Sequence, residues 1–426
     1  MKKTLLIILA VVMVFAFTAC SIAPAPAATA APAATEAPAA ATEAPAATEA
    51  PAAATEAPAA TEAPAATEAP AAGDLSTVVG TDGQPLLLPM EGKEIPPRPE
   101  DPEALPETDP LHWYDMEYAG WDAANKENPP TSPMNGPEGK KVTVIINGDH
   151  PYLTAYSNGA KIAAEALGMK VDIKSPNWDL NVQNQMVDQA INEKPDMIVL
   201  VPLDPKAAVQ QFRKINQAGI PVIGSNMLPD AEGIAYMITW SGPDDFGQMA
   251  MIGDMLGKEM GGKGGVAYLT HNPGGSPYFA RYNRVEAQLA KNFPDIKTLD
   301  FQSPGFEADK VKQVVSDWIT KFGDKLNAIV VADDSAQAIG AVEAMKEAGR
   351  EDIIVVGAGN SKVGMDYVKD GSLTGITYQS AEADGAIPLK LAADWFTNGK
   401  VDQPIYYLPQ HVITAADVDE YLPAQW

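Results

Sequence analysis

The sequence is poor in the residues that build most covalent and metal-dependent sites. Its 426 residues include one cysteine, Cys20, which excludes a disulfide framework and a multi-cysteine metal site. Its four histidines are scattered and lack the spacing of metal ligands: His112, His150, His271 and His411. No Gly-x-Ser-x-Gly elbow of a serine hydrolase occurs. These absences argue against an enzyme, and we expect no cofactor and no metal.

One segment partly matches a phosphate-binding loop. Gly257 and Gly262 have the required spacing and Lys263 follows, but Gly264 stands where serine or threonine is needed. The segment also lies between a predicted helix and a predicted strand, whereas a phosphate loop joins a strand to the helix that follows it. We therefore interpret it as the end of a helix and a turn.

Basic residues are scarce compared with acidic ones. Lys and Arg total 30 against 56 Asp and Glu, which gives a formal net charge of -26 at pH 7. A surface this acidic argues against binding to nucleic acid or to anionic lipid head groups. We expect no nucleic-acid partner and interpret the charge as favouring solubility outside the cell.

The beginning of the sequence has the pattern of an export signal. Two lysines precede an apolar run over residues 5–17 that is too short to span a bilayer. The run ends in Phe17-Thr18-Ala19-Cys20, which resembles a bacterial lipobox with phenylalanine in place of the usual leucine. We predict a lipoprotein signal peptide over 1–20, lipidation of Cys20 and contact with a membrane only through that lipid. The alternative is an ordinary signal peptide and a buried thiol.

Two proline-rich stretches follow. Residues 21–72 repeat Ala-Pro-Ala-Ala-Thr-Glu with small variations, and frequent proline with almost nothing large to bury predicts a semi-extended tether. An interaction segment is the alternative. Residues 73–138 form a proline-rich, acidic extension, and we expect its aromatic residues to dock on the globular domain: Trp113, Tyr114, Tyr118 and Trp121.

Beyond residue 140, strands and helices alternate. Val142-Thr143-Val144-Ile145-Ile146 is a continuous apolar run, typical of a strand that is buried on both faces. Such runs alternate with helical patterns, which indicates parallel sheets with right-handed crossovers. The predicted fold class is α/β, with two doubly wound parallel-sheet lobes that form a cleft where their strand ends face each other. The predicted strands are 142–146, 170–173, 197–201, 221–224, 234–238, 265–269, 297–301, 328–331 and 353–357.

Eight segments of the sequence follow one another in the same order as in a known protein family. They are His150-Pro151-Tyr152, residues 184–190, residues 195–198, Gly219-Ile220-Pro221-Val222-Ile223, Arg284, Ala332-Asp333-Asp334, Thr377-Tyr378-Gln379 and residues 409–422. In this order they resemble the type I periplasmic binding proteins, in particular the ribose- and galactose-binding branch. The resemblance covers about residues 141–422, and no single segment is specific.

The resemblance implies a domain over 139–422 whose chain crosses between the lobes three times. We expect these hinge crossings near Ser241, near Thr377 and near Val401. Hinge motion at such crossings closes the lobes over a ligand. The first lobe is predicted at about 141–241 and 379–401, and the second at about 242–376 and 402–422.

The resemblance also implies which residues bind the ligand. The matching positions are Asn147, Tyr152, Asn226, Arg284 (with Arg281 one turn earlier), Asp333, Asn360 and Gln379. Family members that bind simple sugars usually have carboxylates at the positions of Asn226 and of Gly359, beside Asn360. Their loss weakens the case for a plain monosaccharide and favours a ligand with its own acid group, or a non-sugar molecule.

Each position also has a purely structural interpretation. Tyr152 could be ordinary core, and Arg284 an exposed helix residue in a salt bridge. Asp333 could simply cap the helix that follows it, and Gln379 could be a plain strand residue. The loop at Asn147 could be offset by one residue.

These observations predict an extracytoplasmic solute-binding lipoprotein. We expect it to act as a monomer in the cell envelope, periplasmic or lipid-anchored on the outer side of the cytoplasmic membrane. It would deliver a small sugar or sugar-like solute to the permease of an ABC importer. The alternative is a ligand-sensing receptor for a membrane chemoreceptor or kinase, which would share the fold and the cleft.

Overall fold

A computed structural model describes residues 75–87, 95–118, 121 and 124–426. These residues belong to one unit of the chain, Glu68–Trp426. The predicted signal peptide, Cys20 and the tether over 21–72 lie outside the described residues.

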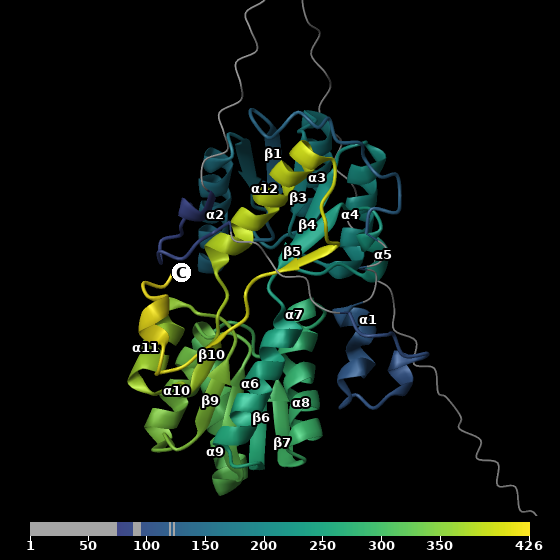
Figure 1. Ribbon diagram of the computed structural model, residues 1–426. Coiled ribbons are helices and arrows are strands. Elements are labelled where there is room, and N and C mark those ends of the chain that lie inside the picture. The colour runs from purple at the N-terminus through teal and green to yellow at the C-terminus, as the bar shows by residue number, and fades with distance from the viewer. Residues whose placement is uncertain (1–74, 88–94, 119–120, 122–123) are drawn as a thin grey trace, which may run out of the picture. The chain divides into compact units, whose positions relative to one another are not determined.

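The first lobe is a six-stranded sheet in the order β11-β5-β4-β3-β1-β2, shown in the upper half of Figure 1. All its neighbouring strands are parallel, as the apolar runs predict. Its strands are β1 (Lys141–Ile145), β2 (Lys170–Lys174), β3 (Met197–Leu200), β4 (Val222–Ser225), β5 (Thr239–Gly242) and β11 (Ile405–Tyr407). Its helices are α2 (Pro151–Ala166), α3 (Leu180–Glu193), α4 (Pro205–Gln217), α5 (Ala231–Ile234) and α12 (Ala381–Asn398).

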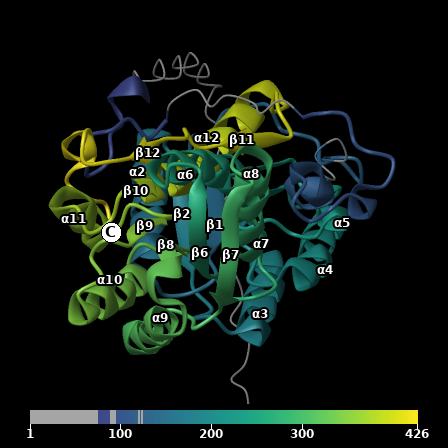
Figure 2. The ribbon, with the colours of Figure 1, turned by 90° about the horizontal axis from the view of Figure 1, so that it is seen from below.

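The second lobe repeats this plan in the order β12-β10-β9-β8-β6-β7, with only β12 antiparallel to its neighbour. Figure 2 shows α6 and α8 over one face of the sheet and α9 and α10 over the other. The strands are β6 (Lys263–Leu269), β7 (Asp295–Gln302), β8 (Leu326–Val331), β9 (Ile354–Gly357), β10 (Gly375–Thr377) and β12 (Val412–Ile413). The helices are α6 (Asp245–Glu259), α7 (Ser276–Phe279), α8 (Val285–Asn292), α9 (Ala308–Phe322), α10 (Ala336–Ala348) and α11 (Lys362–Asp370).

Local sequence explains where many of these helices begin. Asp204 accepts a hydrogen bond from the Ala207 amide ahead of Pro205, which is suited to the first helical position. Ser361 and Ser380 cap α11 and α12 in the same way, each accepting from an amide three residues later. Both serines follow strand ends, so the caps also fix where the chain leaves the second sheet.

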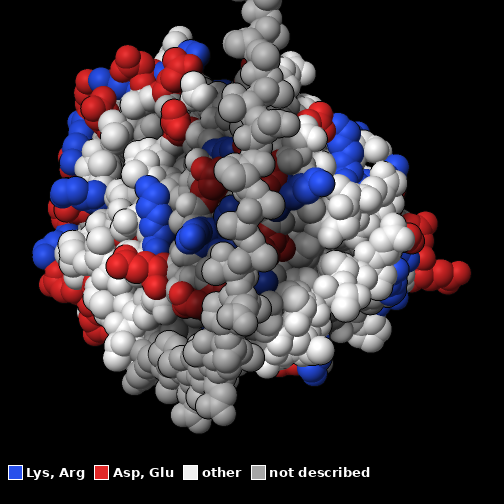
Figure 3. All heavy atoms as spheres, turned by 90° about the horizontal axis from the view of Figure 1, so that it is seen from above, with Lys and Arg blue, Asp and Glu red and all other residues white. Residues whose placement is uncertain are grey.

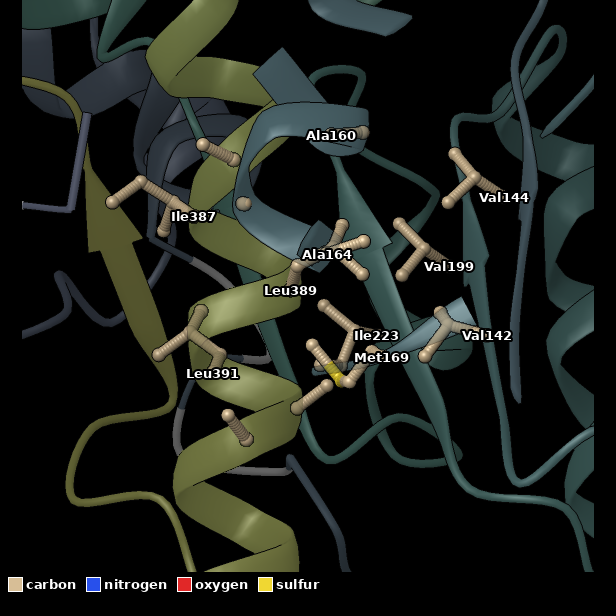
Figure 4. Packing of buried hydrophobic residues seen from close by; sticks show 14 of the residues in the cluster. Val142, Val144, Ala160, Ala164, Met169, Val199, Ile223, Ile387, Leu389 and Leu391 are labelled. Atoms are coloured by element: carbon tan, nitrogen blue, oxygen red, sulfur yellow. The ribbon is translucent and has the colours of Figure 1, made fainter. Parts of the chain in front are cut away.

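The core of the first lobe lies between α2, α12 and the sheet. Figure 4 shows Ala160 and Ala164 of α2 beside α12, with the strand residue Val199 to the side of Ala164. The two helices approach so closely that a Cβ at Gly159 would lie 1.8 Å from the Glu382 carbonyl oxygen. Glycine is therefore required there, and α12 is held firmly behind the strand ends.

The chain passes between the lobes at 242–245, 378–380 and 408–411. The first two crossings agree with the expected positions near Ser241 and Thr377. The third does not lie near Val401, because β11 first joins the edge of the first sheet beside β5. The strand expected at 234–238 is also displaced: residues 231–234 form α5, and the strand is Thr239–Gly242.

The proline-rich extension packs on both lobes. Trp121 is buried, with its ring 5.6 Å from that of Trp240 in the first lobe. Trp113 lies 6.0 Å from Phe279 of the second lobe. Aromatic packing therefore anchors the extension on the domain, as its composition predicts.

Charge is mixed on the surface seen from above the first lobe. Figure 3 shows basic and acidic side chains interspersed among the coloured residues of this face. No helix within the described ranges has the length and apolar character needed to cross a membrane.

Candidate functional site

A pocket of about 250 Å³ lies where the strand ends of the two lobes face each other. Five of the predicted residues line it: Asn147, Tyr152, Asn226, Asp333 and Gln379. The first three come from the first lobe and Asp333 from the second, while Gln379 lies in the second crossing between them. This is the position at which open α/β sheets place their ligands.

The first-lobe wall is formed by side chains that follow the ends of β1 and β4. Asn147 is 4 % exposed, and its Oδ1 has no hydrogen-bond partner among the described residues. Asn226 follows β4 with a left-handed φ of 60°, a conformation that asparagine tolerates better than most residues. Tyr152 lies in the first turn of α2, where the His150 side chain accepts from its amide.

A buried carboxylate holds this wall from behind. Asp384 Oδ2 accepts hydrogen bonds from the Tyr152 hydroxyl at 2.9 Å and from Asn226 Nδ2 at 2.6 Å. Burial raises the pKa of Asp384 to about 7, and these two hydrogen bonds counteract only part of that effect. Asp384 lies in α12 and does not line the pocket, so it positions the two side chains that do.

The second-lobe wall is built around an ion pair. Arg281 lies 2.9 Å from Asp245, and their side chains are only 13 % and 9 % exposed. Arg281 also donates to the Ala332 carbonyl oxygen at 2.8 Å and, through Nη2, to Gln379 Oε1 at 3.5 Å. Gln379 Nε2 in turn donates to Asp245 and to Gln248. The network fixes the guanidinium and the hinge amide together at the wall of the pocket.

Asp333 does not cap the helix that follows it, because the N-cap residue of α10 is Ser335. Its Oδ1 accepts from the Ser335 amide at 3.1 Å and from the Ser335 hydroxyl at 2.6 Å, which shapes the turn before α10. It also lines the pocket. The neighbouring Asp334 is fully buried, and burial, followed by repulsion from Asp333, raises its pKa well above the ordinary value.

Two expected residues do not line the pocket. Arg284 instead lines a separate hollow between the extension and α8, and Arg281 takes the place expected for it. The reason is a π-helical turn at Ala280–Arg284, which rotates the helix faces relative to a regular helix. Asn360 is buried behind the wall, where its Oδ1 accepts from the Gln379 amide.

Aromatic rings that the sequence did not identify complete the pocket. They are His150, Trp178, His271, Phe306 and Trp426. Burial lowers the pKa of His271 to about 3, so this ring is neutral near pH 7. His150 had a signal in the sequence, since it belongs to the segment that carried the resemblance. Trp178, Phe306 and Trp426 come from loops and from the last residue of the sequence, where no periodic pattern marks them.

The arrangement suits a small polyhydroxylated molecule. Amide, carboxylate and guanidinium groups offer both donors and acceptors, and aromatic rings offer apolar faces. The described part of the chain contains no cluster of His, Cys, Asp or Glu that could hold a metal ion.

Comparison with known proteins places the chain among solute receptors. Residues 142–400 match the model of the periplasmic binding protein domain. The chain is 29% identical over 283 residues to the xylitol-binding protein of Mycolicibacterium smegmatis, covering 66% of this chain and 78% of that one. It is 27% identical over 280 residues to the ribose import binding protein of Bacillus subtilis, covering 64% of this chain and 88% of that one.

Solved structures share the fold at lower identity. A solute binding protein from Actinobacillus succinogenes with bound D-allose superposes with a TM-score of 0.61 at 24% identity, covering 66% of this chain and 100% of that one. A solute binding protein from Bacillus halodurans with bound myo-inositol superposes with a TM-score of 0.60 at 23% identity, covering 67% of this chain and 98% of that one.

Proposed function

Because the chain belongs to the periplasmic binding protein domain family, we propose that it captures a sugar or polyol outside the cytoplasm and delivers it to an ABC importer. The pocket between the lobes carries this proposal, because both of its walls offer hydrogen-bonding groups beside aromatic rings. The two relatives named above are a xylitol-binding and a ribose import binding protein, which favours transport over the alternative of a sensor. Asn226 and Gly359 in place of carboxylates favour a ligand with its own acid group, or a non-sugar molecule such as a polyol, over a plain monosaccharide.

A thermal-shift screen with calorimetric follow-up tests this proposal. The panel contains xylitol, D-ribose, D-apiose, D-allose and myo-inositol, with L-leucine as a ligand without sugar hydroxyls. A solute that binds only the folded protein stabilises it by about 2.7 kcal/mol at a hundred times its Kd. We expect at least one panel member to raise the melting temperature and leucine to leave it unchanged. A melting temperature that no panel member changes would contradict the proposal.

We further propose that the protein acts as a monomer attached to the membrane through Cys20. The lipobox-like triplet before Cys20 and the acidic, proline-rich stretch after it support an anchor and a spacer. Cys20→Ser should leave an unprocessed precursor or release the protein from the membrane fraction. The same fractionation and migration for the variant and the wild type would refute the anchor without affecting the binding proposal.

A further inference from the structure

Trp426 lines both the pocket and a second hollow. The inner pocket of about 250 Å³ and an outer hollow of about 760 Å³ share only two lining residues, His150 and Trp426. The inner volume corresponds to about eight water molecules, which suits one small polyol or sugar ring. The outer hollow would accommodate a longer molecule if the boundary between the two were open.

The segment that ends in Trp426 is attached to both lobes. The Trp426 carbonyl oxygen accepts from the Lys362 amide at the start of α11, at 2.6 Å. The Gln425 side chain accepts from the Glu382 amide at the start of α12 and donates to the Ser380 hydroxyl in the crossing. The segment is therefore bonded to the second lobe through its backbone and to the start of α12 through a side chain.

The indole ring is placed by packing on residues of both lobes. It makes an edge contact with Tyr152 at 5.4 Å and lies 5.7 Å from His150. On the other side, a Cβ at Gly359 would lie 3.3 Å from the ring, and Gly359 has a left-handed φ of 111°. The buried indole Nε1 has no hydrogen-bond partner among the described residues. No side-chain hydrogen bond therefore fixes the ring, which allows it to turn aside without breaking one.

We propose that Trp426 is a gate that restricts the ligand to the length of the inner pocket. In this proposal its ring forms the wall between the two hollows. Its carbonyl oxygen ties that wall to the second lobe, and the side chain of the preceding Gln425 ties it to the start of α12. The outer hollow already has polar lining suited to further hydroxyl groups, including Asn158 and Glu382, which bond to each other. This inference deepens the proposed function and rests on it.

Calorimetry of Trp426→Ala with two probe sets tests the gate. The short set is xylitol, D-ribose and D-allose, and the long set is maltitol, lactose and sucrose. We expect the short solute that wild type binds to lose about tenfold or more in affinity. We also expect the Kd of at least one long probe to fall at least tenfold below its wild-type value, because the wall against the longer molecules is gone. Long-probe Kd values that stay at the wild-type level would overturn the gate, whatever the loss for the short solute.

Two tryptophan variants keep the test independent of folding. Trp426→Phe retains a ring and should keep most of the selectivity, while it removes the part of the ligand-induced fluorescence change that comes from this indole. Trp113→Phe is the matched control, because Trp113 lies on the extension and does not line the pocket. Identical fluorescence changes in both variants would contradict a ligand contact at Trp426. If wild type bound no probe, the proposed function would fail and the gate with it. Wild-type binding of a short solute together with unchanged long-probe Kd values in Trp426→Ala would refute the gate alone.

Discussion

The two walls of the pocket occupy equivalent positions in two similar lobes, yet they are held by different electrostatics. In the first lobe, Tyr152 and Asn226 donate to one buried carboxyl group, Asp384, whose pKa is about 7. In the second lobe, Arg281 and Asp245 form a charge-balanced pair. The first wall can gain or lose a proton near neutral pH, whereas the second is held by an ion pair. Equivalent topology therefore fixes where the groups lie but not which kind of interaction holds them.

The largest expected effect comes from breaking the second wall. Arg281→Ala removes a charged donor at the pocket and leaves Asp245 buried without its cation. We expect affinity for the solute identified in the screen to fall about ten- to a hundredfold, since a hydrogen bond to a charged group is worth roughly 1.5–3 kcal/mol. Titration calorimetry measures the loss.

Arg284→Ala is the matched control for that variant. It lies three residues further along the same helical segment and removes the same kind of side chain, but it lines the hollow beside the extension. We expect the affinity to stay within about twofold of wild type. Equal losses in the two variants would show that the second wall is not built as described.

Asp384→Asn should produce a smaller change that depends on pH. Because the pKa of Asp384 is raised from 3.8 to about 7 in the folded protein, the native state keeps a proton that the unfolded state loses. The stability contribution is fully present below about pH 4 and is lost as pH rises to 7. The asparagine variant should show a flatter dependence of melting temperature on pH between 4 and 7. Its affinity at pH 7 should change only a few-fold, since the amide still offers an acceptor.

Asp394→Asn on the same helix is the control for replacing a carboxyl group by an amide away from the pocket. Its side chain is 39% exposed and pairs with Lys390, away from the pocket. The pH dependence of its melting temperature should match that of wild type. If the melting temperature of Asp384→Asn depended on pH as steeply as that of wild type, Asp384 would not be the group that holds the proton.

The smallest expected effect is that of deleting residues 21–72. This stretch has almost nothing to bury, and the pocket is formed entirely by residues from 147 onward. Affinity should be unchanged within error by calorimetry. A clear loss would show that residues outside both walls contribute to binding.

Sequence reasoning located residues at the pocket where position follows from topology. Asn147 and Asn226 follow strands that the apolar runs identify, and the end of such a strand must face the cleft. It failed where a local irregularity intervened. A single π-helical turn put Arg281 rather than Arg284 at the pocket, and periodicity contains no sign of that turn.

Long-range contacts explain the remaining errors. Asp384 acts from the helix behind the wall, and Trp426 reaches the pocket from 274 residues beyond Tyr152 in the sequence. The third crossing lies later in the chain than expected because Ile405–Tyr407 pairs with β5 at the edge of the first sheet. Such pairings depend on the packed structure and leave no pattern in the local sequence.

A crystal structure with the bound solute tests the central claim most directly. We predict ligand density in the inner pocket, within hydrogen-bond distance of Asn147 or Asn226 on one side and of Arg281 or Asp333 on the other. Both walls would then hold one molecule. Density that touches only one lobe, or that lies only in the outer hollow beside Lys161, would contradict the account.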